Sequence, residues 1–446
     1  MLKCSVPQSR SIQEIARSHI DASQGYLNKM IRKTTLPNGV RILTEVVDEV
    51  YSASIGVYVD VGSEDETEQN NGVSHCLEHM LFKGTSKRTA QEISQEIEDV
   101  GGSLGAATGK ENTCFYGRVM GDQLDVAVDL LLDMIVDANL DKEDFELERQ
   151  VILEEIKMYD DDPEDYAHET LILNIWPNHP LGLPITGTVE TVSGFDEKVV
   201  REHVDRFYRP ERLVISIAGK FDEQKVIDQI ATALSDMKPG KRHDKVGAPK
   251  MKRYRAVKHR DIEQAHISIV SDGLSITDQD RYVFAILDLC LGGNMSSRLF
   301  QEVREKRGLV YTINSFRESH RANGLFGVYA GASPKQVGTV LDLISEEFQR
   351  TKSEGFTEQE INRGKIQLRS ELLLGLESMR NRSARSAYGE LFYGRQLEVD
   401  EIVADIDRVT GQQVKDLANR LIKPDLLSMI VVGPGSELQP DYELAC

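Results

Sequence analysis

The sequence predicts an α+β protein made of two similar α/β-sandwich domains. The chain has 446 residues, which is more than one hydrophobic core usually supports. A segment rich in proline, glycine and charge, Asp236–Lys250, separates two parts of similar length. The two parts also end alike, because Phe207–Gly219 and Leu421–Gly433 share a helix end, a proline, an apolar strand and a glycine at matching spacing. We therefore expect one domain that occurs twice.

These observations divide the chain into an N-terminal extension (1–33), a first domain (34–235), a linker (236–250) and a second domain (251–446). The extension carries several basic residues, but Glu14 and Asp21 interrupt them, and a transit peptide is usually poor in acids. It also lacks the apolar centre and the cleavage site of a secretory signal. A helical extension is the expectation that fits best.

The first domain begins with a predicted hairpin over Thr34–Leu43, in which Asn38 and Gly39 form the turn. The alternation of Ala53–Val61 predicts a strand, and an acidic loop then leads to a helix that holds His75–Phe82.

The next predicted helix, Ala90–Val100, ends where two glycines follow it. A β-branched and aromatic run through Thr113–Tyr116 predicts a strand. Asp141–Tyr159 has the length of a long helix, with acidic residues in its first turn.

Composition excludes several classes of function. The chain has 53 basic and 73 acidic residues, a net charge of -20 that argues against nucleic acid as a partner. The same charge suits basic substrates, although a plain acidic surface is the commoner explanation. No apolar run reaches the roughly 18 residues that a membrane span needs.

Cysteine usage indicates a reducing compartment. The five cysteines are scattered and form no CxxC pair, so neither a disulfide framework nor a thiolate zinc site is predicted. We expect a cytoplasmic protein, or one of the mitochondrial matrix if the source is eukaryotic.

The run His75-Cys76-Leu77-Glu78-His79 carries the clearest chemical signal. Residues at i and i+4 of a helix lie on one face, so both imidazoles can bind one zinc ion. Glu78 then projects beside that face, where it can act as a general base. Cys76 lies about 100° around the helix from His75 and is expected to pack in the core.

A catalytic zinc ion needs a third protein ligand and one open position. The predicted helix Asp141–Tyr159 offers several glutamates, and Glu148 and Glu155 share a face because they are two turns apart. One could bind the metal while the other orients a histidine. Periodicity alone leaves Glu154 and Glu155 as alternatives for the ligand.

At these residues the chain resembles the pitrilysin (insulinase) family of zinc metallopeptidases, in its processing-peptidase-like branch. The resemblance covers nearly everything after the extension, including His75–Thr85, Gly101–Tyr116, Glu148–Ile156 and His179–Gly182. It implies the fold of that family, in which two similar α+β domains enclose a chamber. Cys76 departs from the family, which more often has a larger apolar residue there.

The resemblance also implies roles for individual residues. It selects Glu155 as the third zinc ligand and places Glu148 behind a histidine ligand. It implies that Arg304 and Tyr311 bind the substrate and stabilise the developing oxyanion. The second domain has Ile286–Cys290 where the first has its histidines, so one zinc ion per chain is expected.

We therefore expect a zinc-dependent endopeptidase that cleaves short or unfolded peptides added along an edge strand near Gly102–Tyr116. The alternative is a non-catalytic structural or assembly subunit, like the relatives in respiratory complexes that tend to have lost their ligands. Chains of this length in the family commonly form dimers. The expected partners are thus a peptide substrate and a second subunit, either a copy of this chain or a related one.

Overall fold

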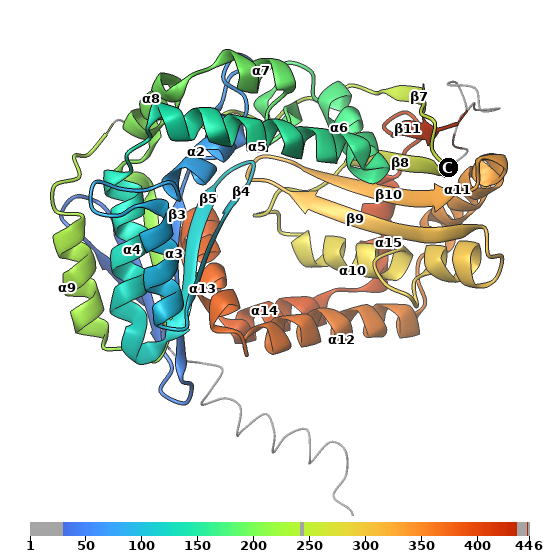
Figure 1. Ribbon diagram of the computed structural model, residues 1–446. Coiled ribbons are helices and arrows are strands. Elements are labelled where there is room, and N and C mark those ends of the chain that lie inside the picture. Colours follow the sequence, from blue (N-terminus) through green and yellow to red (C-terminus); the bar gives the residue numbers. More distant parts are fainter. Residues whose placement is uncertain (1–29, 241–244, 435–443, 445–446) are drawn as a thin grey trace, which may run out of the picture.

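The computed structural model describes residues 30–240, 245–434 and 444. Figure 1 shows two halves, each built on one β-sheet, that face each other across the middle of the molecule. Residues 1–29, which contain most of the predicted N-terminal extension, lie outside the described residues.

The sheet of the first half has six strands in the order β1-β2-β6-β3-β5-β4. β2 runs parallel to β6, and every other neighbouring pair is antiparallel. β4 is therefore an edge strand whose described partner is β5 alone. In sheet order the strands are β1 (Arg32–Thr35), β2 (Arg41–Val46), β6 (Leu213–Gly219), β3 (Ser52–Val59), β5 (Thr113–Met120) and β4 (Ser103–Thr108).

The sheet of the second half repeats this topology without the first strand. Its order is β7-β11-β8-β10-β9, with β7 parallel to β11 and the remaining pairs antiparallel. β6 and β11, which lie in the two segments that look alike in the sequence, occupy the same place in their sheets. The strands are β7 (Arg255–His259), β11 (Ser428–Gly433), β8 (Ala265–Asp272), β10 (Gly324–Ala332) and β9 (Val310–Ser319).

Helices cover both sheets. Those of the first half are α2 (Val73–Leu81), α3 (Ala90–Asp99), α4 (Leu124–Asp137), α5 (Lys142–Asp161), α6 (Pro163–Ile175), α7 (Val189–Gly194), α8 (Glu197–Phe207) and α9 (Glu223–Ala233). Those of the second half are α10 (Arg281–Leu291), α11 (Val337–Glu354), α12 (Glu358–Gly375), α13 (Met379–Tyr388), α14 (Val399–Arg408) and α15 (Gly411–Leu421).

Side chains alternate between the two faces of the sheet along each strand, and this alternation decides which face each helix covers. Ile55 and Val57 of β3 point into the core beneath α4, while Ser54 and Tyr58 point to the opposite face of the sheet. That opposite face packs against α13, a helix of the second half.

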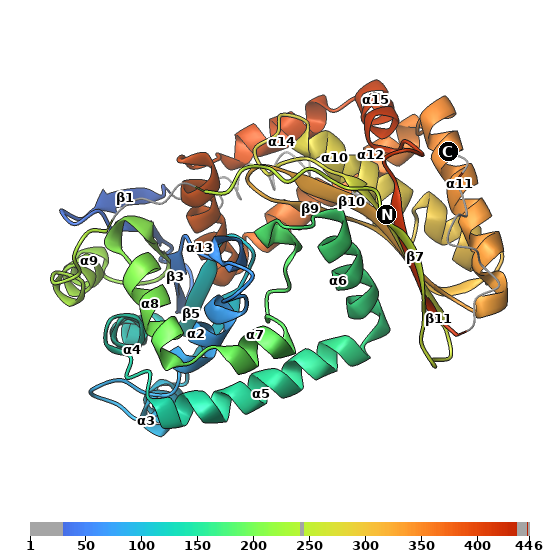
Figure 2. The same cartoon turned by 90° about the horizontal axis from the view of Figure 1, so that it is seen from above.

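The two halves exchange one helix each. α6 leaves the first half and packs on β8 and β11, where Leu171 and Ile175 meet Val270 and Ile430. α13 makes the reverse crossing and packs on β3 and β6. Figure 2 shows each helix beside the sheet of the other half. Each core is therefore completed by a helix from the other half of the chain.

The two sheets and their helices confirm the predicted α+β architecture with a repeated domain. The predicted hairpin turn is present, with Gly39 in the left-handed region at φ 102°. The predicted helices over 75–82, 90–100 and 141–159 correspond to α2, α3 and α5 within a few residues. In the part of the chain that the structure describes, no helix has both the length and the apolar character needed to cross a bilayer.

Candidate metal centre

Helix α2 carries the two histidines, and its start is fixed by a buried carboxylate. Glu66 accepts hydrogen bonds from the backbone N–H groups of Gly72 and Ser74, at 2.7 and 2.8 Å, and from the Asn71 amide at 2.9 Å. A carboxylate at a helix N-terminus satisfies free donors and complements the helix dipole. Burial nevertheless raises the pKa of Glu66 to about 7.

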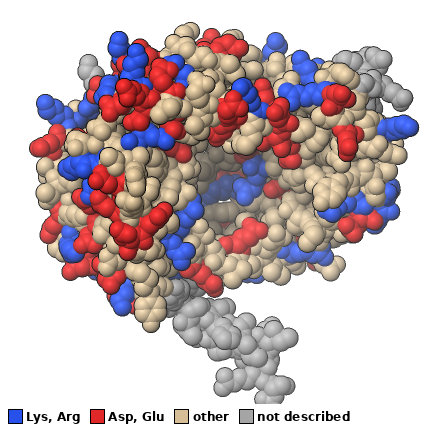
Figure 3. Space-filling view, in the orientation of Figure 1, with Lys and Arg blue, Asp and Glu red and all other residues tan. Residues whose placement is uncertain are grey.

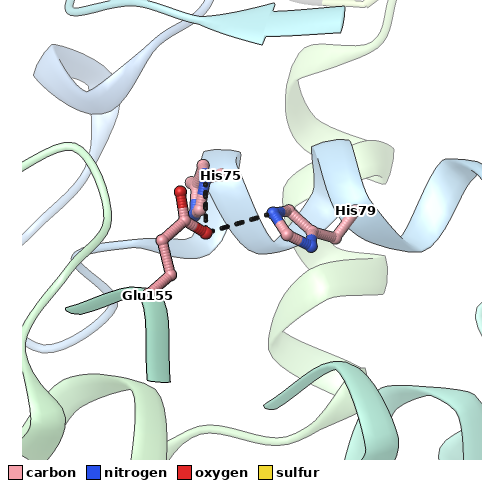
Figure 4. A group of neighbouring side chains, drawn as sticks. All are labelled: His75, His79 and Glu155. Atoms are coloured by element: carbon pink, nitrogen blue, oxygen red, sulfur yellow. Dashed lines mark ion pairs between the residues drawn. The ribbon is translucent and has the colours of Figure 1, made fainter. Parts of the chain in front are cut away.

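The structure brings His75, His79 and Glu155 together (Figure 4). The Nε2 atoms of His75 and His79 lie 3.6 and 3.5 Å from the same Glu155 oxygen, Oε2. The ligand atoms of all three residues lie within 4.8 Å of one another. Two residues from one helix face and one from α5 thus converge on a single point.

The geometry also separates the two glutamates that periodicity left open. The Glu154 side chain is 73% exposed and pairs with Lys157 at 2.6 Å, one turn further along α5. Glu155, the next residue, faces the histidines instead. Glu155 is therefore the member of the pair that lies in position to bind a metal.

Glu148 lies behind His79, where it contacts the ring nitrogen on the side away from Glu155. Its Oε2 is 2.9 Å from His79 Nδ1, and its Oε1 is 2.5 Å from Lys83 Nζ. Burial opposes ionisation of this carboxylate, but the hydrogen bonds from Lys83 and His79 outweigh burial and lower its pKa. A carboxylate in this place fixes the tautomer and orientation of the imidazole.

His75 is a buried, neutral imidazole. Burial, together with the nearby His79, lowers the pKa of His75 to about 4. A histidine must be neutral to donate its lone pair to a metal.

Glu78 lies on α2 between the histidines and is held from the edge strand of the sheet. The hydroxyl of Thr108, at the end of β4, donates a 2.5 Å hydrogen bond to Glu78 Oε2. Burial raises the pKa of the Glu78 carboxyl. A raised pKa improves a carboxylate as a proton acceptor near neutral pH.

Cys76 packs in the core, as its place on the helix predicted. It is 1% exposed and belongs to the main apolar cluster of the first half. Burial raises the pKa of its thiol to about 12, so the thiolate that would bind metal is disfavoured.

Arg304 and Tyr311 lie together in the second half, on the short helix η5 (Phe300–Glu305) and on β9. The Arg304 guanidinium is 5.6 Å from the centre of the Tyr311 ring and 4.7 Å from that of Phe300. Tyr311 is 76% exposed, which leaves its hydroxyl free to meet a ligand. No hydrogen bond or ion pair among the described residues joins this pair to the histidines.

The donor set fits zinc. Two imidazole nitrogens and one carboxylate oxygen are a known set for catalytic zinc, which keeps its fourth position open. Within the described ranges this is the one such group of three residues, and the aligned helix of the second half, α10, has none.

Comparison with known proteins agrees with this geometry. Residues 41–189 match the family model for insulinase, peptidase family M16, and residues 194–368 match that for the M16 inactive domain. A zinc protease of Streptomyces coelicolor, described as uncharacterized, is 41% identical over 92% of this chain and 91% of its own length. The chain belongs to peptidase family M16, the insulinase family.

A second relative supports the same assignment, and solved structures share the fold. The zinc protease YmxG of Bacillus subtilis, also described as uncharacterized, is 36% identical over 91% of this chain and 99% of its own length. The fold matches an M16 inactive domain from Pseudomonas fluorescens, with TM-score 0.85, 19% identity and coverage of 92% and 99%. It also matches a chain of complex III from Candida albicans, with TM-score 0.80, 21% identity and coverage of 91% and 96%.

Three supporting residues were not singled out from the sequence. Lys83 lies within the segment of the resemblance, and its spacing of four from His79 places it one turn along the chain. Thr108 and Glu66 contact α2 from other elements, so no local pattern connects them with the histidines.

Proposed function

We propose that this member of family M16 is a zinc-dependent endopeptidase that hydrolyses short or unfolded peptide segments. The observation that carries the proposal is the convergence of His75, His79 and Glu155, with Glu78 beside them. The names of the relatives as zinc proteases support it.

Each residue of the site has a separate task in the proposed reaction. A zinc ion held by His75, His79 and Glu155 would supply Lewis-acid chemistry, activating water and polarising the peptide carbonyl. Glu78 accepts the proton of the attacking water on its carboxylate and returns it to the leaving amine. Thr108 orients that carboxylate through its hydrogen bond.

The edge of the first sheet offers a place for the peptide. β4 pairs on one side with β5, so its other side presents backbone donors and acceptors that an extended peptide can use. Because Thr108 ends β4 and contacts Glu78, a peptide added there passes beside the general base.

Arg304 and Tyr311 would act from the second half. We propose that their guanidinium and phenol bind the substrate and stabilise charge that develops on the carbonyl oxygen. Their mutual contact and the exposure of Tyr311 support this role. We also propose that the chain works as a dimer, with a second copy or with a related subunit.

The test combines metal content with cleavage of a quenched peptide. We expect about one zinc ion per chain in both wild type and Glu78→Gln, and cleavage by the wild type alone. Glu154→Gln, which changes a neighbouring carboxylate that faces solvent, serves as the control and keeps activity.

The other outcomes are also informative. Absence of zinc from the purified, zinc-supplied protein would disprove the proposal. Zinc binding without cleavage of any peptide would favour the alternative, a non-catalytic subunit. A chain of complex III has the same fold.

A further inference from the structure

A cavity of about 520 Å³ lies on the first sheet, on the face that α13 covers only in part. Strands β3, β5 and β4 form its floor, and the end of α12 and the start of α13 form its wall. It lies beside the free edge strand β4, at the end of that strand opposite to Thr108. The cavity contains none of the residues assigned above to the metal centre.

The floor of the cavity is a row of polar side chains across three strands. Ser54 of β3 is opposite Arg118 of β5, and Arg118 is opposite Ser103 of β4. Residues that face each other in this way point to the same side of the sheet. Ser54 is 2% exposed, and its hydroxyl has no hydrogen-bond partner among the described residues. A buried polar atom without a partner at the bottom of a cavity indicates a place for a polar ligand.

The next row brings an arginine of the second half to the same edge. Tyr116 lies between Gly56 and Gly105, and a Cβ at Gly105 would come within 2.7 Å of the Tyr116 hydroxyl. The ring therefore reaches over the edge strand. The guanidinium of Arg380, in the first turn of α13, stacks on that ring at 3.9 Å.

The cavity has a positive balance of charge. Arg118 and Arg380 form no ion pair with any residue that the structure describes, and one acid, Glu377, lies on the wall. The N-terminal end of α13, where Ser378 is the cap, adds partial positive charge. Figure 3 shows Lys and Arg side chains inside the central hollow, whereas Asp and Glu are abundant around its rim. The lining of the cavity thus differs in sign from the net charge of the chain, which is -20.

We propose that this cavity is a specificity subsite that binds a carboxylate of the peptide substrate, either an acidic side chain or a chain terminus. The inference rests on the proposed function, because it places the peptide along β4. Arginine guanidinium groups recognise carboxylates through paired hydrogen bonds, and the two arginines border the strand to which the peptide adds.

The register of β4 fixes where the carboxylate should lie. Ser103 is five residues from Thr108, which contacts the general base. Strand residues rise about 3.3 Å each, so the cavity lies roughly 17 Å along the edge from the point of cleavage. An added strand pairs residue by residue, and the subsite therefore takes a residue about five positions from the scissile bond.

The test is a positional scan with the full-length, zinc-loaded chain. A quenched peptide of neutral residues receives one glutamate at successive positions on both sides of the scissile bond. We expect kcat/KM to rise about tenfold over the peptide without glutamate at a position about five residues away, on one side. The ratio of kcat/KM with the glutamate to kcat/KM without it should fall toward one in Arg118→Gln and in Arg380→Gln. It rises further in Glu377→Gln, which removes the competing carboxylate.

Arg408→Gln, on an exposed face of α14, is the matched control and keeps the wild-type ratio. Arg118→Lys retains the charge but loses the paired hydrogen bonds, so its ratio should lie between those of the wild type and Arg118→Gln. The same positional profile in wild type and in both arginine variants would overturn the subsite.

A second measurement separates the subsite from the proposed function. The same peptides, carrying a fluorophore, are titrated against Glu78→Gln and against Glu78→Gln/Arg118→Gln. If the wild type cleaves nothing, the proposed function fails, yet tighter binding of the five-position glutamate peptide that depends on Arg118 still supports the subsite. Binding that ignores the position of the glutamate disproves the subsite alone. A carboxylate that acts only at the last residue identifies the chain terminus as the ligand.

Discussion

Glu148 shows how one residue outside the metal ligands can control the site. Its two oxygens contact His79 Nδ1 and Lys83 Nζ, so it fixes the imidazole from behind. We predict that Glu148→Gln lowers zinc affinity by about 10- to 100-fold, because the ring loses a charged acceptor that sets its tautomer. Competition with a chelator of known affinity measures the effect.

The control for this prediction lies on the same helix. Glu154→Gln removes one negative charge from the same helix, α5, but leaves the contact between Glu148 and His79 intact. Its zinc affinity should match that of the wild type. Equal affinities for the Glu148 and Glu154 variants would show that the contact with His79 has no role in metal binding.

His203 gives a prediction about pH. The ring is 3% exposed on α8, with Nε2 3.2 Å from the Ser74 hydroxyl, and burial, assisted by Arg206 and Arg212, lowers its pKa to about 3. Between pH about 6.5 and about 3, the unfolded chain binds a proton here that the folded chain excludes. Stability therefore falls as pH falls through this window, by about 1.4 kcal/mol per unit for one proton.

Urea unfolding of the metal-free protein from pH 7 to 4 checks this expectation. His203→Gln removes the titrating group, so its stability should fall less steeply with decreasing pH than that of the wild type. The comparison uses slopes, since the substitution also changes packing against Phe207. Parallel slopes would contradict the prediction.

At the residue scale, the sequence predicted the part of the site that one helix encodes. His75, Glu78 and His79 are readable because helical spacing places them together without any tertiary information. Glu155 needed either the resemblance or the fold, since periodicity along α5 cannot distinguish it from Glu154. Thr108 and Glu66 reach α2 through the fold alone.

At the scale of elements, the sequence predicted α2, α3 and α5 to within a few residues. The sequence did not indicate that α6 and α13 pack on the opposite sheets, because an apolar face shows that a helix is buried but not against which partner. A polar contact accompanies the crossing of α13. The fully buried Arg382 on α13 pairs with Glu45 of β2, and the hydroxyl of Ser383 donates to the Ser216 carbonyl oxygen at 2.8 Å.

The buried pair supplies the prediction for this element. Arg382→Met leaves the Glu45 carboxylate buried without its partner, and we expect a loss of about 3–5 kcal/mol. Urea unfolding with a probe near α13 measures the loss. In a double-mutant cycle, adding Glu45→Met should recover much of the stability. If the double variant loses as much free energy of unfolding as the two single variants combined, the proposed coupling is contradicted.

At the scale of the whole molecule, the repeated domain and the exchange of helices α6 and α13 have opposite consequences for whether each half can fold alone. Two copies of one domain suggest that each could fold alone, and each does contain its own sheet and main apolar cluster. The exchange makes each half incomplete. Without α13 and the short helix η7 (Gly389–Tyr393) that follows it, Leu43, Tyr58 and Val214 of the first sheet lose the cover of Ala387 and Leu391. Without the second sheet, the apolar face of α6 has no partner.

We therefore predict that residues 1–240 and 241–446, expressed separately, expose apolar surface and aggregate or bind a hydrophobic dye. Expressed together as two chains, they should form a soluble 1:1 complex, because the exchanged helices tie each half to the other across two buried interfaces. Size-exclusion chromatography with light scattering distinguishes the outcomes.

The two-chain complex also connects the architecture with the site. The zinc ligands all lie before residue 240, so a first half that folds normally by itself would bind zinc with the affinity of the intact chain. If α6 must pack on the second sheet to hold the end of α5, Glu155 loses its position in the isolated half and zinc affinity falls, while the complex restores it. Full zinc affinity in a soluble, monomeric 1–240 fragment would show that the exchange serves neither folding nor the metal centre.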